Sequence, residues 1–265
     1  MGLLTIGSDP ELFLREKLSQ NLVASIGKIG GTKEDPIPFS ARQGFYVQED
    51  NVAVEFNIPP AWTKADFVDS ISYGMTELQK LLEPWELTLH ISASEYFPEK
   101  ELEKPGARMF GCTPDFNAWE NGRRNPRPHL INVPNLRSCG GHIHIGYENK
   151  DKNWILGIVK ACDITLGCPS VFVDTDERRR HLYGKAGCFR PTAYGVEYRV
   201  LSNFWLRSKE LMGWAYDGIH KAMEIYTEKG MEELDKLKDP ITEAINNGNK
   251  DAASFVMGKF GIQGI

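Results

Sequence analysis

The heptapeptide Gly140-Gly141-His142-Ile143-His144-Ile145-Gly146 decides how this chain is interpreted. Side chains alternate across a strand, so His142 and His144 share one face while the two isoleucines point to a core. Two imidazoles on one strand face suit a metal ion or a phosphate. The plainer alternative is a polar sheet face with two incidental histidines.

Three further segments have the same two-faced character. In Val196–Val200 the polar face carries Glu197 and Arg199, in Val52–Asn57 it carries Glu55, and in Gly7–Leu14 it carries Asp9 and Glu11. Taken singly, each is equally well explained by a solvated strand face or by an exposed ion pair that contributes little to stability.

The four segments are more informative together. If they pair in one antiparallel sheet, the shared face gathers carboxylates that repel one another unless cations lie between them. Hard oxygen ligands favour Mg²⁺ or Mn²⁺ over zinc, and we expect two or more such ions. Arginine cannot be a ligand but suits a phosphate held by the same metals. The face therefore predicts a metal–nucleotide site.

The rest of the chain predicts an α+β fold with an antiparallel sheet. The first 60 residues have strand character, with a hairpin over 45–56 that turns at 49–51. A strand is expected at 85–93, a long loop at 98–136 and a basic, glycine-containing loop at 174–194. The spacing of apolar residues predicts helices over 63–83, 151–168, 208–229 and 240–258.

Composition limits the class of protein. The chain has 265 residues, a formal charge of −5 and 41% hydrophobic residues, so it is neither disordered nor a broad nucleic-acid or membrane-surface binder. Neither a secretory signal nor a 20-residue apolar span occurs. Five cysteines without a C-x-x-C pair fit a reducing cytosol, so we expect a cytoplasmic protein. Cys112 or Cys139 as a nucleophile is a minor alternative.

Several basic residues are candidates for phosphate binding. Lys33 follows Gly30-Gly31. The strand of Glu197 is preceded by Arg178-Arg179-Arg180 and Lys185, and Arg190 lies closer to that strand in the sequence. A solvated basic loop that binds RNA or nothing is the alternative for the arginine run. Neither a Walker A loop nor G-x-G-x-x-G is present.

The order of these motifs resembles the phage and bacterial COOH-NH2 ligase (amidoligase) family, which is similar to glutamine synthetase and the glutamate–cysteine ligases. The resemblance covers about residues 4–206 and leaves 208–265 without a counterpart. It rests on the segments Gly7–Glu11, Gln48–Asn57, Gly111–Trp119, Gly140–His144, Tyr183–Gly187 and Glu197–Arg199.

The resemblance implies a curved, glutamine-synthetase-like antiparallel sheet with helices on its outer face, and ATP-dependent amide formation. It assigns Asp9, Glu11, Glu55, His142 and Glu197 to divalent metals, although glutamine synthetases usually have Glu where Asp9 stands. His144 would be a neighbour of the nucleotide or substrate, and Arg199 would stabilise phosphate. The residues expected to bind nucleotide are His144, Arg199, Lys185, Arg180 and Lys33; those expected to be catalytic are Arg199, Glu197 and Arg190.

We accordingly expect an acyl phosphate formed from a substrate carboxylate and ATP, which an amine then converts to an amide. Asp115, Asn117 and Arg124, in the long loop, are the candidates for binding small-molecule or peptide substrates. Residues 1–207 would form the catalytic domain, with helices of 208–265 packed on it. Stable nucleic-acid or membrane binding is not expected. A homo-oligomer is possible, and the protein would lie in the host cytoplasm if a phage encodes it.

Three rival functions remain at this point. A guanidino-type phosphotransferase shares this type of sheet. A metal-dependent hydrolase would use the same acids and histidines without nucleotide. A non-enzymatic phage structural or interaction protein would merely have a polar sheet.

Overall fold

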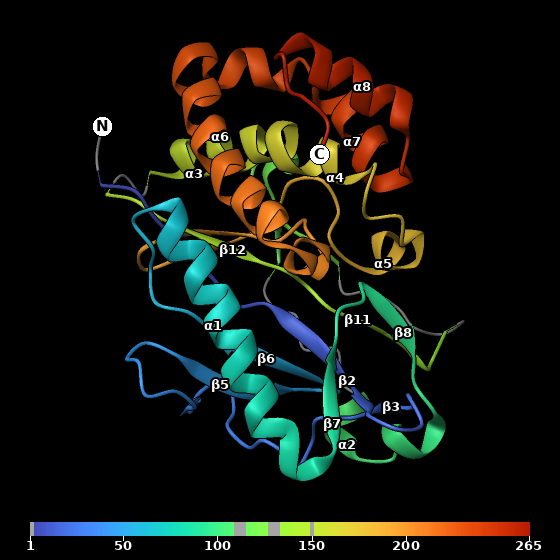
Figure 1. The fold of residues 1–265 in the computed structure, drawn as a ribbon. Coiled ribbons are helices and arrows are strands. Elements are labelled where there is room, and N and C mark those ends of the chain that lie inside the picture. Colours follow the sequence, from blue (N-terminus) through green and yellow to red (C-terminus); the bar gives the residue numbers. More distant parts are fainter. Residues whose placement is uncertain (1–2, 109–114, 127–132, 149–150) are drawn as a thin grey trace.

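A computed structural model describes residues 3–108, 115–126, 133–148 and 151–265 (Figure 1). The strands are β1 (Thr5–Ser8), β2 (Glu11–Glu16), β3 (Leu22–Val23), β4 (Ile37–Pro38), β5 (Tyr46–Asp50), β6 (Ala53–Asn57), β7 (Leu87–His90), β8 (Ser94–Tyr96), β9 (Phe116–Asn117), β10 (Arg123–Arg124), β11 (Leu136–Ser138), β12 (Ile143–Gly146), β13 (Cys188–Thr192) and β14 (Gly195–Tyr198). The α-helices are α1 (Lys64–Leu82), α2 (Pro105–Arg108), α3 (Lys152–Cys162), α4 (Cys168–Ser170), α5 (Glu177–Leu182), α6 (Lys209–Asp235), α7 (Lys238–Asn247) and α8 (Lys250–Lys259).

The N-terminal segment joins two antiparallel sheets. One sheet has the order β1-β12-β14-β13-β9-β10, and the other has the order β3-β2-β6-β5-β4 with β7 also paired to β2. Only Asp9 and Pro10 separate β1 from β2, so the two sheets meet at that junction and form a curled half-barrel. Because Pro10 has no amide hydrogen to give to a ladder, it suits the break between the two strands. The expected α+β class with an antiparallel sheet is confirmed.

Helices cover the outer face of this half-barrel (Figure 1). Thr63 caps α1 by accepting a hydrogen bond from the Asp66 amide, and the buried Phe67 and Ile71 of α1 share a core with Leu12 of β2. On the other sheet, α3 packs against β13 and β14, and α6 packs on α3 and α1; Ile143 of β12 and Val196 of β14 are fully buried. One continuous hydrophobic core includes residues from both sheets and from α1, α3, α6, α7 and α8. Along the described chain, no helix combines the length and the apolar character that a membrane crossing requires.

Local differences from the sequence prediction have simple causes. The hairpin over 45–56 is present, but its turn falls after Asp50, where Asn51 adopts a left-handed conformation (φ 57°). Within 174–194, expected to be a loop, the structure has α5 and the central strand β13. The predicted helix at 240–258 is two helices, because Gly248 (φ 67°) ends α7. The expected loop at 98–136 contains α2, β9 and β10 in its described part.

Candidate active site

Strand register places five of the predicted residues in neighbouring positions. His144 of β12 is paired with Glu197 of β14, and Glu197 is paired with Arg190 of β13. On the adjoining sheet, Glu11 of β2 is paired with Glu55 of β6. Side chains alternate along a strand, and residues paired across two neighbouring strands point to the same face of the sheet. The groups expected together do come together, but they belong to two adjoining sheets and not to the single sheet that the sequence predicted.

The first cluster consists of Asp9, His144 and Glu197, whose ligand atoms all lie within 4.8 Å of one another. The Nε2 atom of His144 is 3.1 Å from Oδ1 of Asp9. Burial opposes charge on Asp9, but His144 and His142 lower its pKa well below the ordinary value. Burial also opposes charge on His144, yet Asp9 and Glu197 outweigh it and raise the pKa of His144. The pair is thus an anion beside an imidazole that readily takes a proton.

The second cluster consists of Glu11, Asp50 and Glu55, again with ligand atoms within 4.8 Å of one another. Burial, with the negative charge of Asp50, raises the pKa of Glu11 to about 8. Burial and the surrounding acids raise the pKa of Glu55 well above its ordinary value, and burial raises that of Asp50. A carboxylate cluster of this kind holds protons in place of cations at neutral pH.

His142 lies between the clusters and is buried. Its Nδ1 atom is 3.5 Å from Asp9 Oδ1 and 3.3 Å from Glu197 Oε1. Burial lowers the pKa of His142 to about 4, and nearby Arg199 acts in the same direction, so the ring is neutral. The ring fits closely against Gly140, where an added Cβ would be 2.2 Å from Nε2. A neutral imidazole is the form that binds a metal.

Two arginines contact the fully buried Glu197. Arg190 Nη2 is 2.5 Å from Glu197 Oε2, and Arg199 Nη1 donates to Glu197 Oε1. Arg199 also donates to the hydroxyl of Tyr183, and its Nε atom is 3.5 Å from Asp115 Oδ1. Burial raises the pKa of Asp115. Positive charge is therefore concentrated at Glu197, and the field of Arg199 also reaches Glu11 and Asp50 of the second cluster.

The residues present fit divalent cations. In each cluster three potential ligands converge: two carboxylates and one imidazole in the first, three carboxylates in the second. Mg²⁺ or Mn²⁺ accepts both donor sets. The buried Nε2 atom of His142 has no hydrogen-bond partner among the described residues. Buried polar atoms are usually satisfied, and a bound cation is one of the standard reasons for an exception.

A cavity of about 500 Å³ opens onto the clusters. Its lining includes Asp9, Glu55, His144, Arg190 and Lys33. Further lining residues are Pro36, Gly44, Tyr46, Gln48, Asn57, Ile58, Pro59 and Pro60. A volume of this size is in the range of small-molecule sites.

The structure does not bring every predicted residue to this face. Arg180 is buried elsewhere: it donates to the backbone carbonyls of Ile245 and Asp174, which tie α5 to α7. Lys185 and Arg124 are exposed and line no part of the cavity. Asn117 Oδ1 accepts the Trp119 amide and so caps a short helix.

Other members of the site were not predicted. Asp50 was interpreted only as a turn residue, although its place on the hairpin opposite Ala53 gave the clue that its side chain shares the strand's polar side. Gln48 donates to Glu55 (2.9 Å), and Tyr194 stacks on His144 and shares a 2.8 Å hydrogen bond with its Nδ1. An amide or a phenol has no distinctive sequence signal. Of the cysteines weighed as nucleophiles, Cys139 is buried with a raised pKa, and Cys112 lies outside the described residues.

The fold and the site thus define an α+β protein whose half-barrel carries a buried acidic face beside two arginines. Residues 134–259 match the family described as phage phiEco32-like COOH.NH2 ligase-type 2. The match includes β12, β14 and α6–α8, and it confirms the resemblance to COOH-NH2 ligases, a family of enzymes that form C–N bonds. The prediction that the C-terminal helices lie outside the resemblance was wrong. No curated protein matches the chain.

Proposed function

We propose that this protein is an ATP-dependent carboxylate–amine ligase of the glutamine-synthetase-like type. A substrate carboxylate would attack the γ-phosphate of ATP, giving an acyl phosphate and ADP, and an amine would then displace phosphate to leave an amide. The observation that carries the proposal is the pair of three-ligand clusters. Glu197 of the first cluster also forms ion pairs with both Arg190 and Arg199.

The two clusters would hold two Mg²⁺ or Mn²⁺ ions. One ion would be held by Asp9, His144 and Glu197, and the other by Glu11, Asp50 and Glu55. Bound there, the ions would neutralise phosphate oxygens and align the reacting groups. The cavity ending at Asp9 and His144 is the supporting evidence for a substrate approaching these clusters.

Arg199 and Arg190 would counter the charge on the transferred phosphoryl group. Both guanidinium groups are already fixed by Glu197, so little reorganisation is needed when substrate arrives. Such preorganised charge is the main contribution of proteins to phosphoryl transfer. Lys33, on the cavity wall, is placed to contact a phosphate further out.

Asp115 is our candidate for handling the amine. Its carboxylate lies 3.5 Å from Arg199 and is held by the Asn125 amide at 2.9 Å. Because burial raises its pKa, Asp115 is a better proton acceptor than an ordinary aspartate. It would bind the incoming ammonium group and take a proton from it before attack on the acyl phosphate. The acid and amine themselves would be small molecules or peptides.

The first test is thermal unfolding with and without Mg-ATP. A ligand at 100 times its dissociation constant adds about 2.7 kcal/mol, and each kcal/mol raises the midpoint by about 2–4 °C in a chain of this size. We expect a magnesium-dependent rise of several degrees that is lost in Glu197→Gln and His142→Ala. Glu224→Gln, in an exposed ion pair on α6, is the matched control and should keep the rise.

The second test detects the acyl phosphate by trapping it with hydroxylamine. A panel of carboxylic acids is incubated with Mg-ATP, and hydroxamate and ADP are measured together. Equal amounts of both, dependent on the acid, support the ligase. ADP with a phosphorylated amine and no hydroxamate would instead identify a phosphotransferase, and metal-dependent hydrolysis without ATP would identify a hydrolase.

A further inference from the structure

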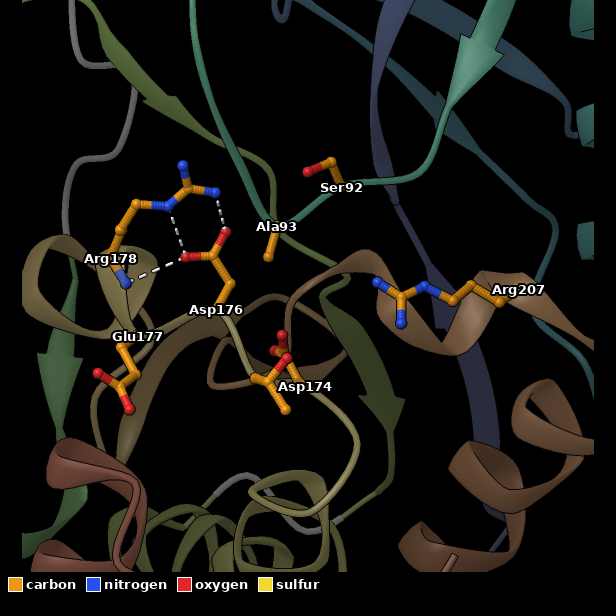
Figure 2. Close-up of a pocket in the computed structure, with 8 residues that line it drawn as sticks. Ser92, Ala93, Asp174, Asp176, Glu177, Arg178 and Arg207 are labelled. Atoms are coloured by element: carbon orange, nitrogen blue, oxygen red, sulfur yellow. Dashed lines mark hydrogen bonds and ion pairs between the residues drawn. The ribbon is translucent and has the colours of Figure 1, made fainter.

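A second pocket lies apart from the acidic face. Its volume is about 440 Å³, and its lining includes Ser92, Ala93, Asp174, Asp176, Arg178 and Arg207. None of its lining residues belongs to the two acid clusters or to the cavity that opens onto them. Figure 2 shows the Arg178–Asp176 pair on one side of this pocket and Arg207 on the other, with its guanidinium turned inward.

Asp174 has a carboxylate without a partner in this pocket. The residue is only 6% exposed, yet no hydrogen bond or ion pair from the described part of the chain reaches its carboxylate. Arg180 donates to the backbone carbonyl of Asp174 and acts on the side chain only through its field. Its carboxylate is therefore available to a ligand in the pocket that Asp174 lines. The position is suited to a cation supplied from outside.

The neighbouring Asp176, in contrast to Asp174, has hydrogen-bond partners for its carboxylate. Its carboxylate accepts from Ser94 at 2.6 Å and from both the backbone and the guanidinium of Arg178. Arg178 also lies over the ring of Tyr96. Asp176 and Arg178 therefore satisfy each other and form a wall of the pocket.

Arg207 is the cation that has no such partner. It is the last residue of the 3-10 helix Asn203–Arg207, is exposed, and makes no ion pair or hydrogen bond with the described residues. Its planar guanidinium is suited to a carboxylate, which it can bind through two parallel hydrogen bonds. The hydroxyl of Ser92 donates to the Ser94 carbonyl, so its oxygen can still accept a hydrogen bond from a ligand.

We propose that this pocket binds a small zwitterion of the α-amino-acid type, with its ammonium group on Asp174 and its carboxylate on Arg207. An anion alone would satisfy Arg207 but would meet the buried charge of Asp174. A cation alone would leave Arg207 unused. A ligand that carries both charges can satisfy both residues, and the volume admits a side chain of moderate size.

The pocket wall is continuous with the segment that carries His142. The Ala93 carbonyl accepts the Cys139 amide at 3.0 Å, and the next residue, Gly140, donates its amide to Glu11 at 2.6 Å. Arg179, beside Arg178, donates to the carbonyls of Cys139, Val200 and Leu201. An amino acid bound in the pocket would thus lie against the backbone that positions both strands of the acidic face.

The experiment is isothermal titration of the full chain with the twenty common L-amino acids, each tested singly. For the tightest amino acid, its N-acetyl and decarboxylated analogues are titrated as matched controls. Asp174→Asn and Arg207→Gln change charge with little change in shape, and Lys209→Gln, an exposed lysine two residues further on, is the control variant. Glu197→Gln reports binding at the other site.

We expect saturable one-site binding of at least one amino acid, weakened about tenfold or more by Asp174→Asn, by Arg207→Gln and by either analogue. Lys209→Gln and Glu197→Gln should leave the affinity unchanged. Binding lost in Glu197→Gln but kept in Asp174→Asn would place the amino acid on the acidic face and overturn the proposal. Absence of binding, or binding of the N-acetyl analogue and inorganic phosphate equally well, would overturn it also.

Discussion

Asp50 ends β5 with its carboxylate close to Glu11 and Glu55. Three acids in one buried space raise one another's pKa and destabilise the fold when no cation is present. Asp50→Asn keeps the shape and can still accept from the Asn51 amide. We expect it to raise stability without metal by about 0.5–2 kcal/mol, the usual range when a functional group under strain is removed, and to abolish the added stability from MgCl₂ with ATP.

Thermal unfolding in EDTA and in Mg-ATP measures both effects. Asp217→Asn is the control, because Asp217 is exposed and paired with Lys64 on the surface, where a pair contributes little. If Asp50→Asn instead lowers the midpoint in EDTA and keeps the Mg-ATP response, Asp50 is not a member of the cation site.

Asp163 provides a pH-dependent prediction away from the acidic face. It is buried and accepts from Trp119, Tyr198 and the Gly187 amide, and burial raises its pKa to about 7. An acid with a raised pKa in the folded state holds its proton more tightly there than in the unfolded chain. Its contribution is therefore complete below about pH 4 and is lost as pH rises through about 7.

The measurement is the free energy of urea unfolding at pH 5, 6.5 and 8 for the native chain and Asp163→Asn. Other titrating groups act equally in both proteins, so the difference between them isolates Asp163. The native chain should lose stability relative to the variant as pH rises, by an amount of the order of 4 kcal/mol at most. Parallel curves would mean that Asp163 does not titrate in this range.

At the level of single residues, alternation along strands was enough to predict Glu11, Glu55, His144 and Glu197, which the register pairs. Asp9 and His142 lie just outside the strands and reach the site by contact with His144 and Glu197. The role of Arg180 could not be predicted in this way. An arginine in a basic run can serve a ligand or backbone carbonyls equally well, and only the packing of α5 on α7 determines which. The role of Asp50 was missed because the turn of the hairpin was expected at 49–51, whereas Asp50 is the last residue of β5.

At the scale of elements, the entry to β12 depends on glycine. An added Cβ at Gly140 would lie 2.2 Å from His142 Nε2, so the imidazole would have to leave its place. We expect Gly140→Ala to fold, because the obstructing atoms belong to a side chain, and to weaken Mg-ATP binding at least tenfold. Titration of the Mg-ATP concentration in thermal unfolding gives the affinity.

Gly258→Ala is the matched control for this substitution. Gly258 lies in α8 with nothing within 4 Å of an added Cβ, and alanine favours a helix by about 1 kcal/mol over glycine. It should raise the midpoint slightly without altering Mg-ATP affinity. Unchanged affinity in Gly140→Ala would show that His142 can move without consequence for the site.

Element boundaries were predicted best where one face is apolar over several turns, as in α1. The helix predicted over 151–168 begins correctly, but its α-helical part ends at Cys162 and continues as a π-helix over Asp163–Gly167. Strand β13 was missed because Pro191 and its glycine-rich approach have the composition of a loop. Its pairing with β14 is decided by the register of Arg190 against Glu197, a contact between strands that no local pattern encodes. The curvature of the sheet likewise arises at the Asp9–Pro10 junction, where pairing changes from β12 to β6.

For the molecule as a whole, the question is whether residues 208–265 are separable from the rest. Helix α6 buries Met212, Ala215, Ile219 and Ala222, and its Tyr216 packs on Phe67 of α1 with ring centroids 5.8 Å apart. Phe67 in turn stacks on the fully buried Trp205. These residues belong to the same core as Ile143 of β12 and Val196 of β14, whose opposite faces lie beside the acid clusters.

A chain that ends at residue 207 would expose this core, so we expect it to lose cooperative unfolding and any response to Mg-ATP. A chain that ends at Ile262 lacks only exposed residues and is the control; it should keep both. Thermal unfolding followed by circular dichroism, with and without Mg-ATP, compares the two truncations. If residues 1–207 unfold cooperatively and still respond to Mg-ATP, the sheet is an autonomous catalytic domain and the helices serve another purpose. Loss of both in that truncation alone would mean that the helices complete the support on which the acidic face depends.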